Sequence, residues 1–224
     1  VKLKKAIFFR VLAPLALTIN SEIEKEREEL QQIYDKGLEA ASADEEQWLR
    51  QLAVRYKLIK AEENLQANQL GELMKRVDQI PLSLVLAQSA EESGWGTSRF
   101  AAEGNALFGQ WAWGANAIKP EQQREGMGNY GIARFDSPLE SMRAYMHNLN
   151  THNAYSSLRS LRAEVRSSGK QPDGATLAQT LIKYSERGQE YVETLLSIMR
   201  VNHLIQADEA YLKEDPVILM VPLE

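Results

Sequence analysis

The sequence predicts a mainly α-helical protein with one short β-containing segment near its middle. Apolar residues recur every three or four positions through most of the chain, which is the spacing of one helix face. Residues 108–136 break this pattern, because they contain five glycines and two closely spaced tryptophans. At 224 residues and 44% hydrophobic content, the chain can bury a core without disulfides, and it contains no cysteine.

Residues 1–75 are expected to form an apolar segment and a helical hairpin that pack on the main domain. The first nineteen residues begin with lysines and an apolar run, as a signal peptide does. Arg10 and Pro14 interrupt this run, no clear cleavage site follows, and the run is too short to span a bilayer. We therefore expect it to dock on the domain, with membrane association as the alternative. An export signal is not evident in this chain and would lie upstream.

Two helices are expected after this apolar run. The first begins near Ser21, which can act as an N-cap, and ends at Gly37. The second begins near Asp44, and its apolar positions continue as far as Val77. Their aromatic residues are interpreted as packing residues, because nothing in residues 1–75 carries recognisable chemistry.

A helix that follows Pro81 carries two adjacent carboxylates at its far end, where Gly94 stops it. Helical spacing places Glu92 two turns beyond Val85, at the edge of the buried face, and directs Glu91 toward solvent. Burial and the negative end of the helix dipole both disfavour an ionised carboxylate, so the pKa of Glu92 is predicted to be raised. A raised pKa suits a general acid, although adjacent glutamates at a helix end are often ordinary surface residues.

Residues 92–98 read Glu-Ser-Gly-Trp-Gly-Thr-Ser, and residues 105–109 read Asn-Ala-Leu-Phe-Gly. These two blocks resemble the glucosaminidase domain of bacterial cell-wall hydrolases, glycoside hydrolase family 73, in its Bax-like branch. The resemblance covers residues 76–205. It implies a lysozyme-like helical domain with a small β-rich lobe over the cleft, cleavage of N-acetylglucosaminyl bonds in peptidoglycan, and Glu92 as the catalytic acid.

The resemblance also implies a second acidic residue in the lobe, where Glu125 is favoured and Glu121 is the alternative. If neither reaches the scissile bond, the acetamido group of the substrate would act as the nucleophile. The expected glycan-binding side chains are Trp95, Asn105, Phe108, Trp111, Trp113 and Tyr191. The two lobe tryptophans have two possible roles: they can stack on sugar rings, or they can pack the lobe against the core.

Three further helices are expected. One begins at Ser137, which forms a capping box with Glu140, a second lies around residues 158–165, and a third begins at Thr176. Residues 183–185 and Tyr191 resemble the tyrosine block of the family. That resemblance makes Tyr184 a catalytic residue whose hydroxyl orients the acetamido group or an attacking water. A core role for Tyr184 is the alternative, with Tyr191 then taking its place. Residues 206–224 are expected to form an acidic tail that ends in an apolar extended segment between two prolines.

The charge distribution bears on the partners that the protein can take. The net charge of −5 lies mostly in residues 206–224, whereas residues 76–205 carry thirteen basic and thirteen acidic side chains. Without a basic stripe, no nucleic-acid partner is expected, and a largely uncharged sugar polymer fits this balance. The three histidines, His147, His152 and His203, are too few and wrongly spaced for a metal site, and there is no cysteine, so no metal and no cofactor are predicted.

The sequence therefore predicts an endo-β-N-acetylglucosaminidase that acts on peptidoglycan strands in the cell envelope, most consistently in the periplasm. A muramidase or a lytic transglycosylase would use the same glutamate on a neighbouring bond. Two alternatives are not enzymes. One is a non-catalytic glycan-binding or scaffold module, and the other is a helical interaction protein that depends on residues 1–75.

Overall fold

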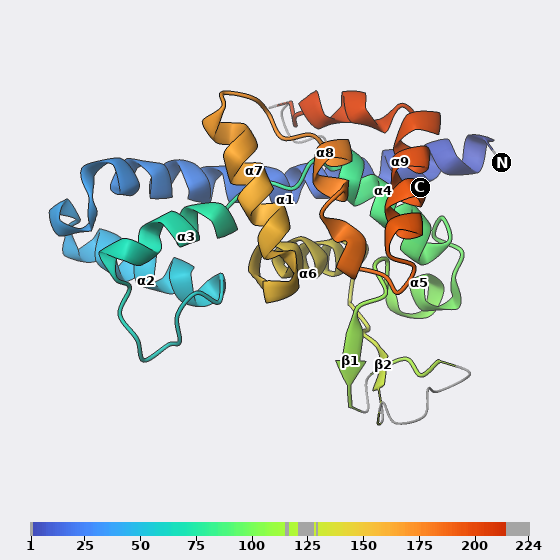
Figure 1. Cartoon of the computed structure of the whole chain (residues 1–224). Coiled ribbons are helices and arrows are strands. Elements are labelled where there is room, and N and C mark those ends of the chain that lie inside the picture. Colours follow the sequence, from blue (N-terminus) through green and yellow to red (C-terminus); the bar gives the residue numbers. More distant parts are fainter. Residues whose placement is uncertain (1, 115–116, 121–127, 129, 214–224) are drawn as a thin grey trace, which may run out of the picture.

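The computed structural model describes residues 2–114, 117–120, 128 and 130–213. Within them the protein is mainly α-helical with one two-stranded sheet, which confirms the predicted fold class. The helices lie together in one body, and the strands project from it as a small lobe (Figure 1). The predicted apolar segment at residues 216–222 lies outside the described residues.

The longest helix, α1, spans Lys2–Lys36 and runs across the whole helical body (Figure 1). The prediction that a helix starts near Ser21 is wrong, because one helix continues through Pro14. The apolar segment before Ser21 does pack on the core, as expected, but as part of this helix. Proline removes one helical hydrogen bond, but Pro14 lies on the exposed side of α1. The opposite face buries Leu12, Ala16 and Ile19, so packing holds the helix together on both sides of the proline.

The second half of the N-terminal hairpin is shorter than the apolar pattern predicts. Helix α2 spans Ala43–Arg55, and a separate short helix, α3, spans Leu70–Arg76. Ser42 starts α2 with a capping box, because it accepts from the Glu45 amide while the Glu45 side chain accepts from the Ser42 amide. The irregular segment between α2 and α3 explains why one continuous helix to Val77 was the wrong expectation.

Helix α4, Leu82–Ser93, is the central element of the fold. Nearly all of its side chains are buried. It packs against four other elements: α1, α8 (Gly174–Ala178), α9 (Gln189–Val201) and the 3₁₀ helix η5 (Leu204–Glu209). Gly94 ends α4 in the left-handed conformation, with φ of 57°, as the sequence predicts. This packing fixes the direction in which the last residues of α4 leave the core.

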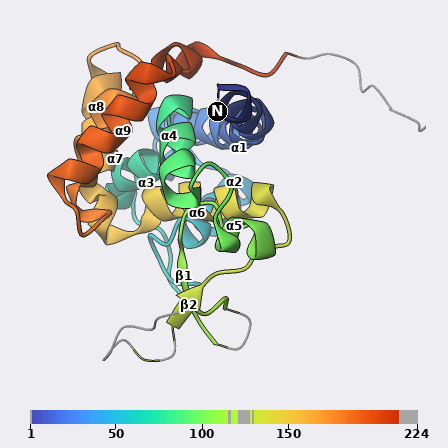
Figure 2. The same ribbon diagram turned by 90° about the vertical axis from the view of Figure 1, so that its right-hand side faces the viewer.

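The remaining elements complete the helical body and the lobe. After α5, Arg99–Gly104, strands β1, Trp111–Trp113, and β2, Tyr130–Ile132, pair antiparallel with Trp111 opposite Ile132. Helix α6, Pro138–Thr151, begins at the predicted Ser137 cap, and α7 spans Ser156–Ser167. The view turned by 90° shows the lobe extending away from the helices (Figure 2).

Candidate active site

The candidate site lies where α4 ends. Glu92 occupies the penultimate position of this helix and is half-buried, at the edge of a face that is otherwise closed to solvent. Burial raises its pKa above the ordinary value for a glutamate, and the neighbouring Glu91 charge raises it further. A hydrogen bond from Tyr191 and the charge of Arg187 act in the opposite direction, but burial is the largest cause. The local prediction of a raised pKa is therefore confirmed.

A chain of hydrogen bonds from three helices holds one oxygen of this carboxyl group. The Tyr191 hydroxyl on α9 donates to Glu92 Oε1 at 2.8 Å. Gln88, one turn earlier on α4, donates from Nε2 to the Tyr191 oxygen at 2.9 Å, and its Oε1 accepts from the Tyr145 hydroxyl on α6. Because Gln88 fills the acceptor side of the Tyr191 oxygen, the hydroxyl proton of Tyr191 points at Glu92.

Tyr191 is a permanent donor in this arrangement. Its ring is 1% exposed, and burial raises its pKa far above the ordinary value for tyrosine. It therefore keeps its proton at neutral pH and well above it. The hydrogen bond to Glu92 Oε1 stabilises the ionised carboxylate and fixes its orientation, which leaves Oε2 as the other position for the acidic proton.

Tyr184, for which a catalytic role is predicted, lies one ring further from Glu92. It stacks on Tyr191 with ring centroids 5.4 Å apart and planes within 4°, and its hydroxyl donates to the Phe108 carbonyl at 3.3 Å. Tyr155 packs on its other side at 5.8 Å. Burial raises the pKa of Tyr184 well above the ordinary value, so its hydroxyl stays neutral. In the structure it is half-buried and holds the loop around Phe108 in place.

The second oxygen of Glu92 faces the loop between α5 and β1. At Gly109, where φ is 60°, a Cβ would lie 3.5 Å from Glu92 Oε2, so the glycine backbone lies beside this oxygen and a side chain there would contact it. The next residue, Gln110, carries a buried Oε1 that has no hydrogen-bond partner among the described residues. Strand β1 starts directly afterwards, so the lobe begins beside the carboxyl group.

Glu91 lies apart from Glu92, as the sequence predicts, but it is not a freely solvated acid. Its side chain is 25% exposed and forms an ion pair with Arg187, in the turn before α9. The Arg187 guanidinium also lies 5.4 Å from the centre of the Tyr191 ring. This ion pair links the end of α4 to the tyrosine segment on the exposed side of the site.

Trp95 lies in the turn after α4 and has φ of 61°, a conformation in which non-glycine residues are uncommon. Its ring packs against Phe8 and Phe9 of α1, with centroid distances of 5.9 and 5.3 Å, and the Lys5 ammonium lies 4.0 Å from its centre. The N-terminal end of α1 therefore contacts the turn that follows Glu92. A role of Trp95 in glycan binding stays a prediction.

The other motif residues separate into exposed and buried groups. Trp111 and Trp113 on β1 are 45% and 67% exposed, so neither is buried as a seal between lobe and core. The Phe108 ring is 2% exposed and stacks on Tyr145 at 3.9 Å, so it packs behind the site and offers no surface to a ligand. Asn105 ends α5 and donates to the Phe135 carbonyl at 2.9 Å, which ties the two ends of the lobe together.

The predicted second acids, Glu125 and Glu121, lie outside the described residues, and the groove expected beside Glu92 stays a prediction. Among the described residues, no group of three or more His, Asp or Glu side chains is placed to hold a metal ion. The described part of the site is thus one protonatable carboxyl group, its tyrosine donor and a glycine beside its second oxygen.

Known proteins resemble this chain over most of its length. Residues 67–204 match the model of the glucosaminidase family, described as mannosyl-glycoprotein endo-beta-N-acetylglucosaminidase. The chain belongs to this glucosaminidase family. It is also 34% identical to protein bax of Escherichia coli (strain K12) over 204 residues, which cover 91% of this chain and 72% of that protein. No solved structure matches the chain. Membership of the glucosaminidase family indicates a glycoside hydrolase with a glycan substrate.

Sequence reasoning identified Glu92 but missed most of its neighbours. Gln88 could have been found, because residues four apart on a helix lie on the same side and Glu92 follows it by four. Gly109 belongs to the motif block at residues 105–109, but helix spacing could not place it beside Glu92. Arg187 offered no signal, since it comes from a different segment of the chain. Tyr145 likewise enters the site only through the packing of α6 against the core.

Proposed function

We propose that this protein is an endo-β-N-acetylglucosaminidase that hydrolyses peptidoglycan in the periplasm, with Glu92 as the general acid. The proposal is supported above all by the half-buried carboxyl group of Glu92, whose pKa is raised by burial and whose Oε1 is held by Tyr191. Family membership supports the reaction class. The near-neutral charge of residues 76–205 suits an extended, largely uncharged sugar chain.

The protonated oxygen is Oε2 in this mechanism. Because Oε1 already accepts the Tyr191 proton, Oε2 delivers its proton to the glycosidic oxygen as positive charge develops on the sugar ring. We expect the scissile bond to reach that oxygen on the side of Gly109, where the chain has no side chain. The exposed rings of Trp111 and Trp113 offer stacking surfaces for sugar rings.

The second half of the reaction is assigned to a lobe carboxylate. Glu125, or Glu121 in its place, activates water on the opposite face of the sugar, and Tyr184 assists through the Phe108 loop that its hydroxyl holds. If both Glu125→Gln and Glu121→Gln retain activity, the acetamido group of the substrate is the nucleophile instead. Glu92→Gln must be inactive in either mechanism.

The decisive experiment is digestion of purified sacculi, followed by mass spectrometry of the released fragments. The wild-type chain should produce new N-acetylglucosamine reducing ends, and Glu92→Gln should lower the rate by about 10²–10⁴-fold, which is the usual contribution of a general acid. Glu91→Gln is the matched control, because it removes a neighbouring carboxylate that pairs with Arg187, and it should retain activity within about tenfold.

The fragments also separate the competing functions. New N-acetylmuramic acid reducing ends would make the protein a muramidase, and anhydro products would make it a lytic transglycosylase. Binding to sacculi without any cleavage would make it a glycan-binding module. An unimpaired Glu92→Gln variant that still folds would refute the assignment of the acid.

A further inference from the structure

The N-terminal half of α1 presents two different faces. Its inner face carries Phe8 and Phe9 on Trp95 and buries Leu12 and Ala16 in the core. Its outer face exposes three large apolar side chains at four-residue spacing: Leu3, Ile7 and Val11 are 73%, 52% and 57% exposed. Residues four apart lie above one another on a helix, so these three side chains form one continuous apolar stripe.

Basic residues border this stripe. Lys4 projects on one side of it and Arg10 on the other, and both are exposed. Lys2 and Lys5 add to the same end of the helix, and the first acidic residue of the chain is Glu22. This charge distribution is unusual in a chain whose net charge is −5. The second half of α1 is acidic, with glutamates at positions 22, 24, 26, 28 and 29.

We propose that the outer face of residues 2–14 binds the surface of a lipid bilayer that contains anionic phospholipids. An apolar stripe flanked by lysine and arginine is the composition of a helix that lies in the headgroup region. The basic border complements an anionic lipid surface, and the apolar stripe complements the acyl chains beneath its headgroups. This surface is defined by Leu3, Ile7 and Val11, with Lys2, Lys4 and Arg10 around them.

The helix lies on the bilayer and does not cross it. By length and composition alone α1 is apolar enough to span a membrane, and a third of that apolar window is buried inside the protein. Insertion would have to remove Phe8, Phe9 and Leu12 from their contacts with Trp95 and the core. Binding in the plane of the surface uses only side chains that the fold leaves exposed. The end of α1 reaches the edge of the helical body, where a flat surface can approach it (Figure 1).

The arrangement would bring the candidate site close to the membrane. Trp95 lies against the inner face of the same helical segment, so the turn after Glu92 would be about one helix diameter, ~10 Å, from the lipid headgroups. Membrane binding by this surface does not depend on the proposed catalytic activity. It can be measured without any glycan.

The test is flotation of the full chain with vesicles of phosphatidylcholine, with and without about 30% phosphatidylglycerol. The chain should bind the anionic vesicles, bind the neutral ones at least about tenfold more weakly, and dissociate when salt is raised to about 0.5 M. The double variant Ile7→Ser/Val11→Ser should bind anionic vesicles at least about tenfold more weakly than the wild type. The charge variant Lys2→Gln/Lys4→Gln should show a similar loss, because each basic residue near the surface contributes about fivefold.

A matched control is present on the same helix. Tyr34 is an exposed aromatic residue, 44% accessible, near the acidic end of α1, so Tyr34→Ser should bind vesicles as the wild type does. All variants change exposed side chains, and circular dichroism will verify that they fold. The proposal is overturned if the wild type ignores anionic vesicles or if the stripe variant binds them undiminished. It is also overturned if the stripe instead supports a concentration-dependent dimer that does not bind vesicles, as measured by sedimentation.

Discussion

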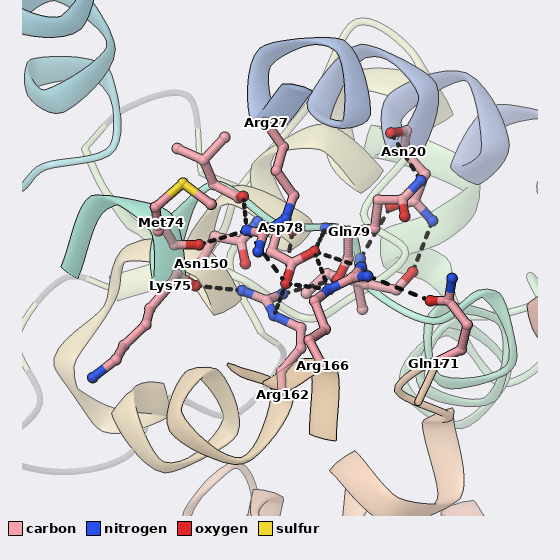
Figure 3. A network of polar contacts seen from close by, with 12 residues as sticks. Asn20, Arg27, Met74, Lys75, Asp78, Gln79, Asn150, Arg162, Arg166 and Gln171 are labelled. Atoms are coloured by element: carbon pink, nitrogen blue, oxygen red, sulfur yellow. Dashed lines mark hydrogen bonds and ion pairs between the residues drawn. The ribbon is translucent and has the colours of Figure 1, made fainter. Parts of the chain in front are cut away.

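Replacing Asp78 by asparagine should destabilise the protein more than any change to its surface ion pairs. The Asp78 carboxylate is 2% exposed and accepts from Arg166 Nε and Nη2 at 2.7–3.0 Å. Arg162 Nε lies 3.3 Å away and Arg27 Nη1 lies 3.6 Å away. Asp78, Arg27, Arg162 and Arg166 form the Asp78 cluster, which joins α1 and α7 to the segment before α4 (Figure 3).

The size of the effect follows from the burial of this cluster. Arg162 is fully buried, and burial lowers its pKa to about 10, so Asp78 compensates a cation that water does not reach. Removing one partner of a buried ion pair costs about 3–5 kcal/mol. For a chain of this size, 1 kcal/mol shifts the melting temperature by about 2–4 °C, which predicts a decrease of about 6–20 °C for Asp78→Asn.

Thermal unfolding followed by circular dichroism measures this difference, with Glu22→Gln as the control. Glu22 pairs with Arg143 between α1 and α6, but both side chains are close to half exposed, so that variant should lose only about 0–1 kcal/mol. A melting temperature of Asp78→Asn within about 2 °C of the wild type would refute the assigned role of the cluster. The cluster matters for the site, because Arg162 also donates to the Lys75, Asp78 and Gln79 carbonyls just before α4.

Two further predictions concern the surroundings of Glu92. Tyr191→Phe removes the donor that stabilises the ionised carboxylate of Glu92, so the pKa of Glu92 should rise. The alkaline limb of the pH–activity profile, where Glu92 loses its proton, should then move to higher pH. Tyr184→Phe is the control and should leave that limb in place, because the Tyr184 hydroxyl donates to the Phe108 carbonyl and not to Glu92. A limb that moves to lower pH in Tyr191→Phe would contradict this. Gly109→Ala should cost about 1–2 kcal/mol of stability for its left-handed backbone. It should also lower activity, because the added methyl group would contact Glu92 Oε2 at 3.5 Å on the side from which the substrate is proposed to reach it. Gly169→Ala, with φ of 75° and open space around the added Cβ, should show only the backbone cost, and equal activity of the two variants would contradict the proposed approach.

Local signals in the sequence determined the elements that carry the site. The spacing of apolar residues, the glycine after Ser93 and the serine at position 137 predict where α4 ends and where α6 begins, because capping and helix periodicity act within a few residues. The same spacing was sufficient to place Glu92 at the edge of the buried face. The glycines and tryptophans of residues 108–136 likewise predicted an irregular lobe with short strands.

Tertiary packing decided what surrounds those elements. The Tyr191 hydroxyl reaches Glu92 across 99 positions of sequence, and Tyr145 reaches Gln88 across 57, so no local spacing relates them. The continuation of α1 through Pro14 was also decided by packing, because contacts of its buried face on both sides of the proline outweigh the one hydrogen bond that proline removes. Sequence thus determined which carboxyl group lies at the helix end, and the fold alone decided which groups orient it.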